Sequence, residues 1–191
     1  MSAAAGSAAG HSGSGHSSSG GSAARTIPAV VLGGSGYVAG ELLRLLAGHP
    51  HFRLAAVLSD SRPGEAVAAS FGHLAPVYPQ ICFSSQQQVE ELVARERAVA
   101  IFSAAPHGAS AALIDALLSR SEAAFGPGAA HVVDISADFR YRSAAAYERV
   151  YHHPHGAPAR LAAFTCALPE QLPSAPTPHM AHPGCFSTAT L

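Results

Sequence analysis

The feature of this sequence that most constrains its fold is a glycine-rich turn between an apolar run and a helical repeat. Residues 27–32 form a short apolar run, as expected for a central strand that is buried on both faces. The turn GGSG follows at 33–36, and apolar residues then recur at helical spacing over 38–46. A strand, a glycine turn and a helix in this order predict the first unit of a nucleotide-binding α/β fold.

The alternation of strand and helix continues along the chain. We expect further strands at 52–58, 99–104, 131–135, 161–166 and 179–181, helices at 87–97, 109–118 and 144–151, an irregular excursion at 60–85 and a loop at 119–130. Strands separated by helices predict a doubly wound, mostly parallel sheet of the Rossmann type with right-handed crossovers. Ligands bind at the carboxyl ends of such strands, and three polar or glycine-containing clusters fall there, at 33–36, 104–107 and 136–140.

Composition sets the domain organisation and excludes some partners. A chain of 191 residues with 48% hydrophobic and 12% charged residues fits a globular protein of one to one and a half domains. A net charge of −1 offers no basic surface for nucleic acid, and no apolar run reaches the roughly 18 residues of a membrane span. We therefore expect a small-molecule partner, no nucleic acid and no membrane.

The chain divides into three segments. Residues 1–26 consist almost entirely of Ser, Gly, Ala and His, which predicts a disordered, low-complexity tail. Residues 27–181 are expected to form a dinucleotide-binding domain, and residues 182–191 the start of a second, catalytic domain. A cytoplasmic location is expected, or an organelle if the tail is a transit peptide.

The glycine turn has the spacing of a dinucleotide-binding fingerprint. Gly33 and Gly36 are followed by Ala39 in the pattern G-x-x-G-x-x-A, in which the first glycine forms the tight turn and the second lets the backbone approach a pyrophosphate. The preference for a 2′-phosphate stays open. Asp60 favours the ribose hydroxyl of NAD, whereas the neighbouring Ser59 and Arg62 favour the 2′-phosphate of NADP.

Cys185 is the candidate nucleophile. It follows Pro-Gly and opens a small-residue, helix-compatible run, where helix amides stabilise a thiolate. A thiolate that attacks an acyl phosphate or aldehyde gives an adduct that exchanges hydride with a nicotinamide. The alternative is a small buried side chain, which is the interpretation favoured for Cys82 and Cys166. His182 is interpreted as structural, because it is too near in sequence to aim at Cys185.

Two polar clusters have competing interpretations. The histidines at 152, 153 and 155 flank a proline, which favours a solvated turn over a metal site, so no metal ligand is predicted. Arg140 follows a strand end and is expected either to grip a carboxylate or phosphate of the substrate or to pair with Asp138 at the surface.

Several stretches together resemble the N-acetyl-gamma-glutamyl-phosphate reductases of the semialdehyde dehydrogenase superfamily. They are GGSGYVAGELLRLLAGHP (33–50), FGHL (71–74), APHGASAALIDALL (105–118), VVDISADFRYRSAAAYERVY (132–151), LPE (168–170) and HPGCFSTATL (182–191). The resemblance implies NADPH-dependent reduction of N-acetyl-gamma-glutamyl phosphate to N-acetyl-glutamate semialdehyde, in arginine biosynthesis, with Cys185 as the nucleophile. It implies substrate contacts from Ser136 and Arg140 and a cofactor site formed by Gly33, Ser35, Gly36, Tyr37, Val38, Ser59, Arg62, Pro106 and His107.

The chain also departs from that family. It has Val38-Ala39 where the family usually has Thr-Gly, His182 where it has Asn, and Cys166-Ala167 where it has Tyr-Gly. The family's second domain, with its catalytic histidine, is not within the 191 residues, so we expect this fragment to bind cofactor without turnover and the full-length protein to be a homo-oligomer. The alternatives are a related reductase of an aminoadipyl or aspartyl phosphate, and a non-catalytic nucleotide-binding module.

Overall fold

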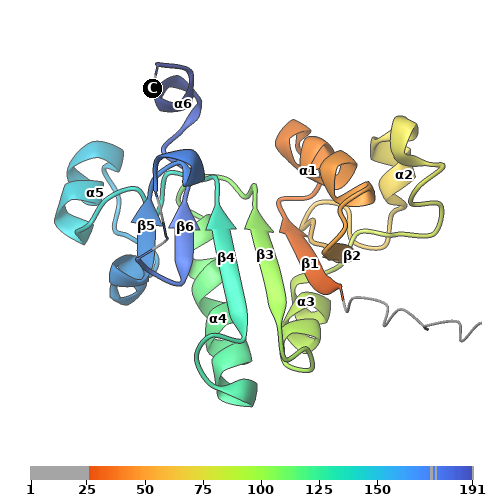
Figure 1. Cartoon of the computed structure of the whole chain (residues 1–191), viewed down its shortest axis with the longest axis horizontal. Helices are drawn as coiled ribbons and strands as arrows, with labels where there is room; N and C mark the ends of the chain where they lie inside the picture. Colours follow the sequence, from red (N-terminus) through yellow and green to blue (C-terminus); the bar gives the residue numbers. More distant parts are fainter. Residues whose placement is uncertain (1–25, 173, 175, 191) are drawn as a thin grey trace, which may run out of the picture.

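A parallel six-stranded sheet forms the centre of the molecule (Figure 1). The computed structural model describes residues 26–190 apart from 173 and 175, so the tail predicted for residues 1–26 lies almost wholly outside the described residues. The strands are β1 (Ile27–Leu32), β2 (Phe52–Val57), β3 (Val99–Ser103), β4 (Ala130–Asp134), β5 (Phe164–Cys166) and β6 (His179–Ala181). Their order is β2-β1-β3-β4-β6-β5, and every neighbouring pair is parallel, which confirms the predicted doubly wound fold.

Helices connect the strands. They are α1 (Tyr37–Ala47), α2 (Val67–Ser70), α3 (Gln86–Val93), α4 (Ser110–Phe125), α5 (Ala144–Tyr151) and α6 (Cys185–Thr190), with 3₁₀ turns η1 (Gly72–Leu74), η2 (Pro158–Ala163) and η3 (Pro169–Gln171). Among the residues described, no helix has both the length and the apolar character that crossing a membrane requires.

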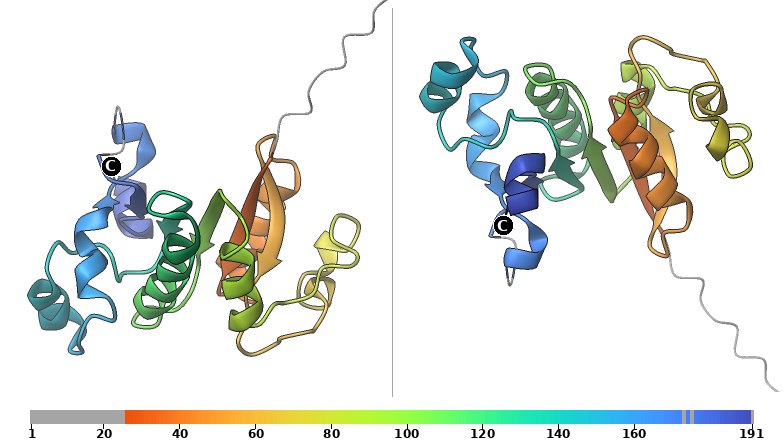
Figure 2. Two further views of the ribbon diagram at one scale, coloured as in Figure 1. Left: turned by 90° about the horizontal axis from the view of Figure 1, so that it is seen from below. Right: turned by 90° about the horizontal axis from the view of Figure 1, so that it is seen from above.

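Alternate residues of β1 enter two separate cores, one on each face of the sheet. Val30 and Leu32 pack in a cluster with buried residues of α3 and α4, whereas Ala29 and Val31 pack with α1 and the segment 67–83. The views along the strands show the corresponding helices on opposite sides (Figure 2). This two-sided burial explains why the strand is a continuous apolar run rather than an alternating pattern.

The loop predicted at 119–130 is wrong over its first half, because α4 continues to Phe125. Serine and small residues after Leu118 suggest a loop, yet Ser121 is fully buried in the helix. The helix ends at Gly126, whose φ of 82° is a left-handed conformation that favours glycine.

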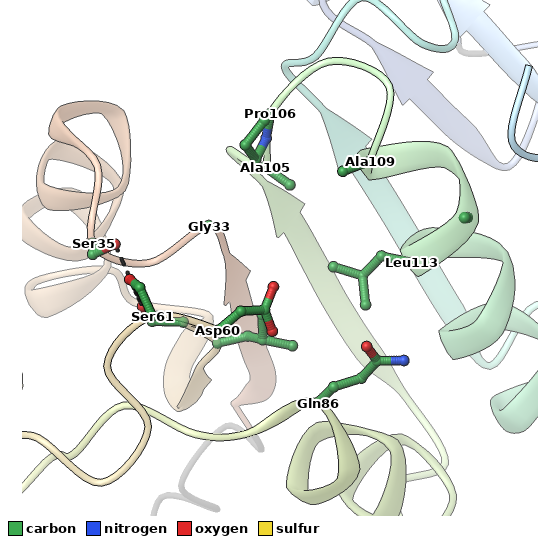
Figure 3. Close-up of a pocket in the computed structure, with 12 residues that line it drawn as sticks. Gly33, Ser35, Asp60, Ser61, Gln86, Ala105, Pro106, Ala109 and Leu113 are labelled. Atoms are coloured by element: carbon green, nitrogen blue, oxygen red, sulfur yellow. Dashed lines mark hydrogen bonds between the residues drawn. The ribbon is translucent and has the colours of Figure 1, made fainter. Parts of the chain in front are cut away.

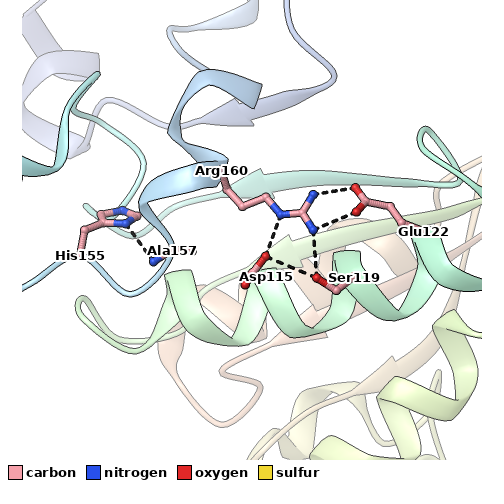
Figure 4. A network of polar contacts seen from close by, with 6 residues as sticks. All are labelled: Asp115, Ser119, Glu122, His155, Ala157 and Arg160. Carbon is pink, nitrogen blue, oxygen red and sulfur yellow. Dashed lines mark hydrogen bonds and ion pairs between the residues drawn. The ribbon is translucent and has the colours of Figure 1, made fainter.

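Arg160 holds η2 against the outer surface of α4 (Figure 4). Its Nε donates to Asp115 at 2.7 Å, and its two terminal nitrogens donate to the carboxylate of Glu122 at 2.6 and 2.9 Å. Bidentate pairing of this kind fixes orientation as well as distance. The strand predicted at 161–166 is accordingly shorter, since residues 158–163 form η2 and only 164–166 pair with β6.

Candidate functional site

A cavity of about 580 Å³ opens at the carboxyl end of the sheet, between the turns that follow β1, β2 and β3 (Figure 3). The chain leaves β1 toward β2 on one side and returns to β3 on the other, so the connections diverge and leave space between them. The lining residues are Gly33, Ser35, Leu58, Ser59, Asp60, Ser61, Gln86, Ala105, Pro106, Ala109, Ala112 and Leu113.

Gly33 and Gly34 are required by packing. Gly33 has a φ of 68°, and a Cβ there would lie 2.5 Å from the carbonyl oxygen of Ala104. A Cβ on Gly34 would overlap Val57 and lie 2.9 Å from the carbonyl oxygen of Leu58. The turn is therefore wedged between the ends of β2 and β3, and side chains at these two positions would disturb the fold itself.

Gly36 differs from its neighbours because it faces open space. It is the residue that precedes α1, and the atom nearest to a Cβ there would be the carbonyl oxygen of Gly33 at 3.7 Å. An α-helix of this length presents free N–H groups and positive potential at its start, which favours a phosphate. Tyr37 and Val38 begin the helix and are exposed.

The end of β2 carries the side chains that the sequence analysis assigns to the 2′-position of a nucleotide. Ser59 is buried, and its hydroxyl lies within hydrogen-bond distance of Ser35 (3.4 Å) and Ser61 (3.3 Å). The carboxylate of Asp60 extends into the cavity, opposite Leu113 (Figure 3).

Arg62 lies outside that cavity. It lines an adjoining hollow of about 610 Å³ together with Ser35, Gly36 and Tyr37, and it donates to Ser70 at 3.2 Å and pairs with Glu65 at 3.7 Å. Asp60 and Arg62, which favour different cofactors in the sequence analysis, therefore line two different hollows. Both hollows include Ser35 in their walls.

The turn after β3 is fastened to the end of β4. His107 accepts the backbone N–H of Ala137 on Nδ1 at 2.8 Å. Pro106 and His107 line a third hollow, of about 320 Å³, whose wall also includes Val38 and Ser136. The predicted residues of the first, third and fourth strand ends thus come together in space.

Asp138 is fully buried and accepts three hydrogen bonds. The donors are the backbone N–H groups of Gly108 (2.8 Å) and Ala111 (3.0 Å) and the hydroxyl of Tyr147 (3.1 Å). Burial, followed by the neighbouring Asp138, raises the pKa of Tyr147. A surface ion pair between Asp138 and Arg140 is therefore the wrong interpretation.

Arg140 instead donates hydrogen bonds to two backbone carbonyls. Its Nε donates to the oxygen of His182 at 2.9 Å, and its Nη2 donates to the oxygen of Ile135 at 3.0 Å. A guanidinium carries five N–H donors, so further ones remain for a ligand.

Ser136 belongs to a buried polar network at the end of β4. Its hydroxyl donates to Asp134 at 2.6 Å and accepts the backbone N–H of Asp138 at 3.1 Å, while Ser110 donates to the other oxygen of Asp134 at 2.8 Å. Desolvation raises the pKa of Asp134, although the hydrogen bonds from Ser136 and Ser110 act in the opposite direction.

The solvated turn that the sequence favours for the histidine loop is wrong for His155, although His152 is exposed. His155 is buried, accepts the backbone N–H of Ala157 on Nδ1 at 3.0 Å, and donates through Nε2 to the carbonyl of Asp138 at 2.7 Å. His153 lies 3.3 Å from the Tyr147 hydroxyl. Across the described part of the chain, no group of three or more His, Cys, Asp and Glu side chains is arranged to hold a metal ion.

All three cysteines are exposed, so the burial expected for Cys82 and Cys166 is wrong. Cys82 sits in an isolated bridge beside the buried Phe83, and Cys166 ends the three-residue edge strand β5. Partial desolvation raises the pKa of Cys166 against the effect of Arg140. Cys185 begins α6, which projects beyond the same sheet edge as the glycine turn (Figure 1).

Sequence reasoning missed several groups at this edge. Gln86 and Leu113 line the cavity from α3 and α4, and a helical pattern gives no signal for which residues of a helix face a ligand. The role of Asp138 was missed because its partners lie on another strand's turn.

Comparisons with known proteins agree with this architecture. Residues 28–170 match the family described as "Semialdehyde dehydrogenase, NAD binding domain". An N-acetyl-gamma-glutamyl-phosphate reductase of Nitrosococcus oceani is 37% identical over 165 residues, which are 85% of this chain and 45% of that protein. A protein of Thermomicrobium roseum named as a putative LysW-L-2-aminoadipate 6-phosphate reductase is 37% identical over 169 residues, covering 86% of this chain and 43% of its own length.

The chain thus spans less than half the length of these relatives. Among solved structures, a Rex-family repressor covers 59% of this chain and 46% of its own with 12% identity and a TM-score of 0.43, a likeness too low to bear on partners.

Proposed function

This chain belongs to the semialdehyde dehydrogenase family, and from that premise we propose that it is the cofactor-binding part of an NADPH-dependent reductase of N-acetyl-gamma-glutamyl phosphate. The observation that carries the proposal is the position of the exposed Cys185, which begins α6, at the sheet edge that also holds the cavity lined by the glycine turn. The names of the relatives supply the substrate, and their greater length suggests that further residues provide the general acid/base.

The described residues fit a nicotinamide dinucleotide. The open space at Gly36 leaves room for a pyrophosphate at the start of α1, and Asp60, Gln86 and Leu113 offer a half-polar, half-apolar wall for the adenosine. Arg62 and the nearby Ser59 favour a 2′-phosphate, which supports NADPH. Val38, Pro106 and His107 form the hollow proposed for the nicotinamide end.

The chemistry proposed for Cys185 is acyl transfer followed by reduction. The thiolate attacks the acyl carbon, the bond from that carbon to the phosphate oxygen breaks, and phosphate leaves while a thioester forms on the sulfur. A bound NADPH supplies the hydride for this carbon. Collapse of the reduced adduct releases the aldehyde and restores the thiolate.

Arg140 and Ser136 are proposed to contact the substrate. Among residues 26–190 that the structure describes, Arg140 donates only to His182 and Ile135, and its other N–H groups are proposed to bind an anionic group. Ser136 lines the hollow beside His107, although its hydroxyl hydrogen is donated to Asp134. We therefore propose that Ser136 contributes to substrate binding through the shape of this hollow.

An aminoadipyl phosphate is the second candidate substrate. The specific observation in its favour is the aminoadipate-phosphate reductase relative, which is as similar to this chain as the N-acetyl-glutamyl-phosphate reductase. Phosphate-dependent reduction of NADP⁺ with each semialdehyde, measured on the protein that carries this chain, distinguishes the two.

The proposal is tested at two levels. The 191-residue chain should quench or enhance NADPH fluorescence on binding but should not oxidise NADPH with the acyl phosphate, and steady oxidation would contradict the expectation that further residues supply the acid/base. In the protein that carries the chain, Cys185→Ser should retain NADPH binding and lose reduction, whereas the matched Cys82→Ser should keep both. Retained activity in Cys185→Ser would rule out the covalent mechanism.

A further inference from the structure

The turn that carries Cys185 is closed by a ring of three hydrogen bonds. The backbone N–H of Gly184 donates to Nδ1 of His182 at 3.1 Å. Nε2 of the same imidazole lies 3.2 Å from the hydroxyl oxygen of Thr188, and that hydroxyl donates to the carbonyl oxygen of Gly184 at 2.8 Å. One imidazole and one hydroxyl therefore engage both backbone polar groups of the residue before the thiol.

The direction of each hydrogen bond in the ring follows from the available hydrogens. Thr188 has one hydroxyl hydrogen, and it is directed at the carbonyl of Gly184, so its oxygen accepts from the imidazole. Nε2 of His182 is then the protonated nitrogen, and Nδ1 is free to accept the N–H of Gly184. The ring thus requires the neutral Nε2–H tautomer, because a doubly protonated imidazole has no acceptor for Gly184.

The backbone of His182 is anchored independently of its side chain. Its N–H donates to the carbonyl of Asp134 at 2.8 Å, and its carbonyl accepts from Nε of Arg140 at 2.9 Å. The imidazole therefore extends from backbone that is fixed to the end of β4, so its position is set by the sheet and not by α6.

Gly184 is the residue in this turn that most needs external support. Its φ of 108° is accessible mainly to glycine, and a Cβ there would lie 3.2 Å from Nη1 of Arg140. A glycine has a wide choice of backbone conformations when nothing holds it. Its conformation orients the peptide that leads into Cys185, and so the Cα from which the cysteine side chain extends.

We propose that His182 and Thr188 are positioning residues for the Cys185 thiol, acting through the two polar groups of Gly184. The catalytic consequence rests on the function proposed above, whereas the positioning itself concerns this chain alone. Without the ring, the helical hydrogen bond from the N–H of Thr188 to the carbonyl of Gly184 at 3.0 Å remains, but the N–H of Gly184 loses its acceptor. The turn before the cysteine then loosens, and Sγ is distributed over several orientations. With it, Sγ is presented in one orientation to the acyl carbon.

The first test measures the orientation directly on the 191-residue chain. The two couplings between the α-proton and the β-protons of Cys185 report its χ1 angle, and ¹⁵N shifts of His182 report which nitrogen carries the proton. We expect unequal couplings and an Nε2–H imidazole in the wild type. His182→Ala and Thr188→Val should both collapse the couplings toward a common averaged value.

Conservative variants distinguish the loss of these hydrogen bonds from a general loss of folding. Thr188→Ser keeps the hydroxyl and should keep the unequal couplings. His182→Asn places an amide oxygen near the position of Nδ1 and should restore part of the difference, whereas His182→Gln lacks an acceptor at that position and should not. Circular dichroism and the signals of the buried β1 residues verify the fold of each variant, and Thr188 is exposed, so its variants are expected to fold.

The second test is kinetic and uses the protein that carries the chain. Misplacement of the nucleophile should lower kcat about tenfold in Thr188→Val with KM little changed. Couplings that stay unequal in both His182→Ala and Thr188→Val, or an Nδ1–H tautomer, would overturn the proposal even if the protein reduces acyl phosphates. If the couplings collapse in both variants but the wild-type protein that carries the chain has no reductase activity, the positioning role of His182 and Thr188 stands and the proposed function is rejected.

Discussion

The carboxylate of Asp138 accepts the backbone N–H of Gly108 at 2.8 Å, although thirty residues separate the two along the chain. The same carboxylate holds Ala111 in the first turn of α4. A group at the end of β4 therefore shapes the turn after β3, which lines both the main cavity and the smaller hollow beside it.

Replacement of Asp138 should lower stability severely. Asp138→Ala removes the acceptor of three donors, of which the N–H of Ala111 and the hydroxyl of Tyr147 are buried. We expect a loss of about 3 to 5 kcal/mol in the free energy of unfolding, measured with urea. Glu41→Ala is the control, because the exposed pair of Glu41 with Arg44 contributes at most about 0.5 kcal/mol. Equal midpoints for the two variants would show that the Asp138 contacts do not stabilise the fold.

Gly36→Ala should separate cofactor binding from folding. A Cβ at Gly36 meets no described protein atom closer than 3.7 Å, so the variant should fold normally, while the methyl group occupies the space that we propose for the pyrophosphate. We expect at least a roughly tenfold loss of NADPH affinity in calorimetry, equivalent to about 1.4 kcal/mol.

Gly48→Ala at the other end of α1 is the matched control. A Cβ there has no neighbour within 4 Å, and its affinity should match the wild type. Unchanged NADPH affinity in a folded Gly36→Ala variant would show that the turn is purely structural.

The separate positions of Asp60 and Arg62 predict opposite effects on the two cofactors. Arg62→Ala should weaken NADPH about tenfold and leave NADH nearly unchanged, because only the former carries a 2′-phosphate for the guanidinium. Asp60→Ala should weaken NADH more than NADPH, because its carboxylate lines the cavity that is proposed for the adenosine. Parallel losses for both nucleotides in Arg62→Ala would exclude a direct phosphate contact.

His179 should make the fold sensitive to acid. Burial, then the charges of His131 and Arg160, lowers the pKa of His179 from 6.5 to about 4. Its Nδ1 accepts the N–H of Val132 at 3.3 Å. The imidazole of His179 takes up a proton at a higher pH in the unfolded chain than in the folded one. Its neutral form therefore stabilises the fold fully above about pH 6.5. As the pH falls to about 4, this contribution of about 3 kcal/mol to the free energy of unfolding is lost.

His179→Asn keeps an acceptor for Val132 and removes the titration. Urea midpoints between pH 7.5 and 4.5 should therefore fall less in this variant than in the wild type, while the exposed His51→Asn should follow the wild type. The raised pKa of Asp134 acts in the opposite direction in both proteins, so it cancels in the comparison. Identical pH profiles for wild type and His179→Asn would refute the assignment.

Some elements with clear boundary residues could be predicted to the residue, although the strand at 179–181 had only a weak apolar pattern. The runs at 27–32, 144–151 and 179–181 coincide with β1, α5 and β6, because apolar patterns end at glycine, proline or polar residues. The length of α4 could not be predicted, since Arg160 secures its second half through Glu122, from thirty-eight residues away.

The candidate site likewise combines features with local sequence signals and features that depend on long-range contacts. The glycine turn and the strand ends are local features, and the parallel topology brings them to one edge. The partners of Asp138 and Arg140 depend on distant backbone groups, which no local pattern encodes. His155 was misread because burial in the loop comes from packing against Phe139 and Tyr147 rather than from its own neighbours.

The insertion of β6 between β4 and β5 also sets an order of assembly during synthesis. β5 emerges from the ribosome before β6, but its pairing partner in the sheet is β6. The edge of β4 accordingly stays open until residues 179–181 have been made, only four residues ahead of the cysteine. The nascent chain therefore completes its sheet only just before it adds Cys185, so this cysteine joins a domain in which every strand already has its partner.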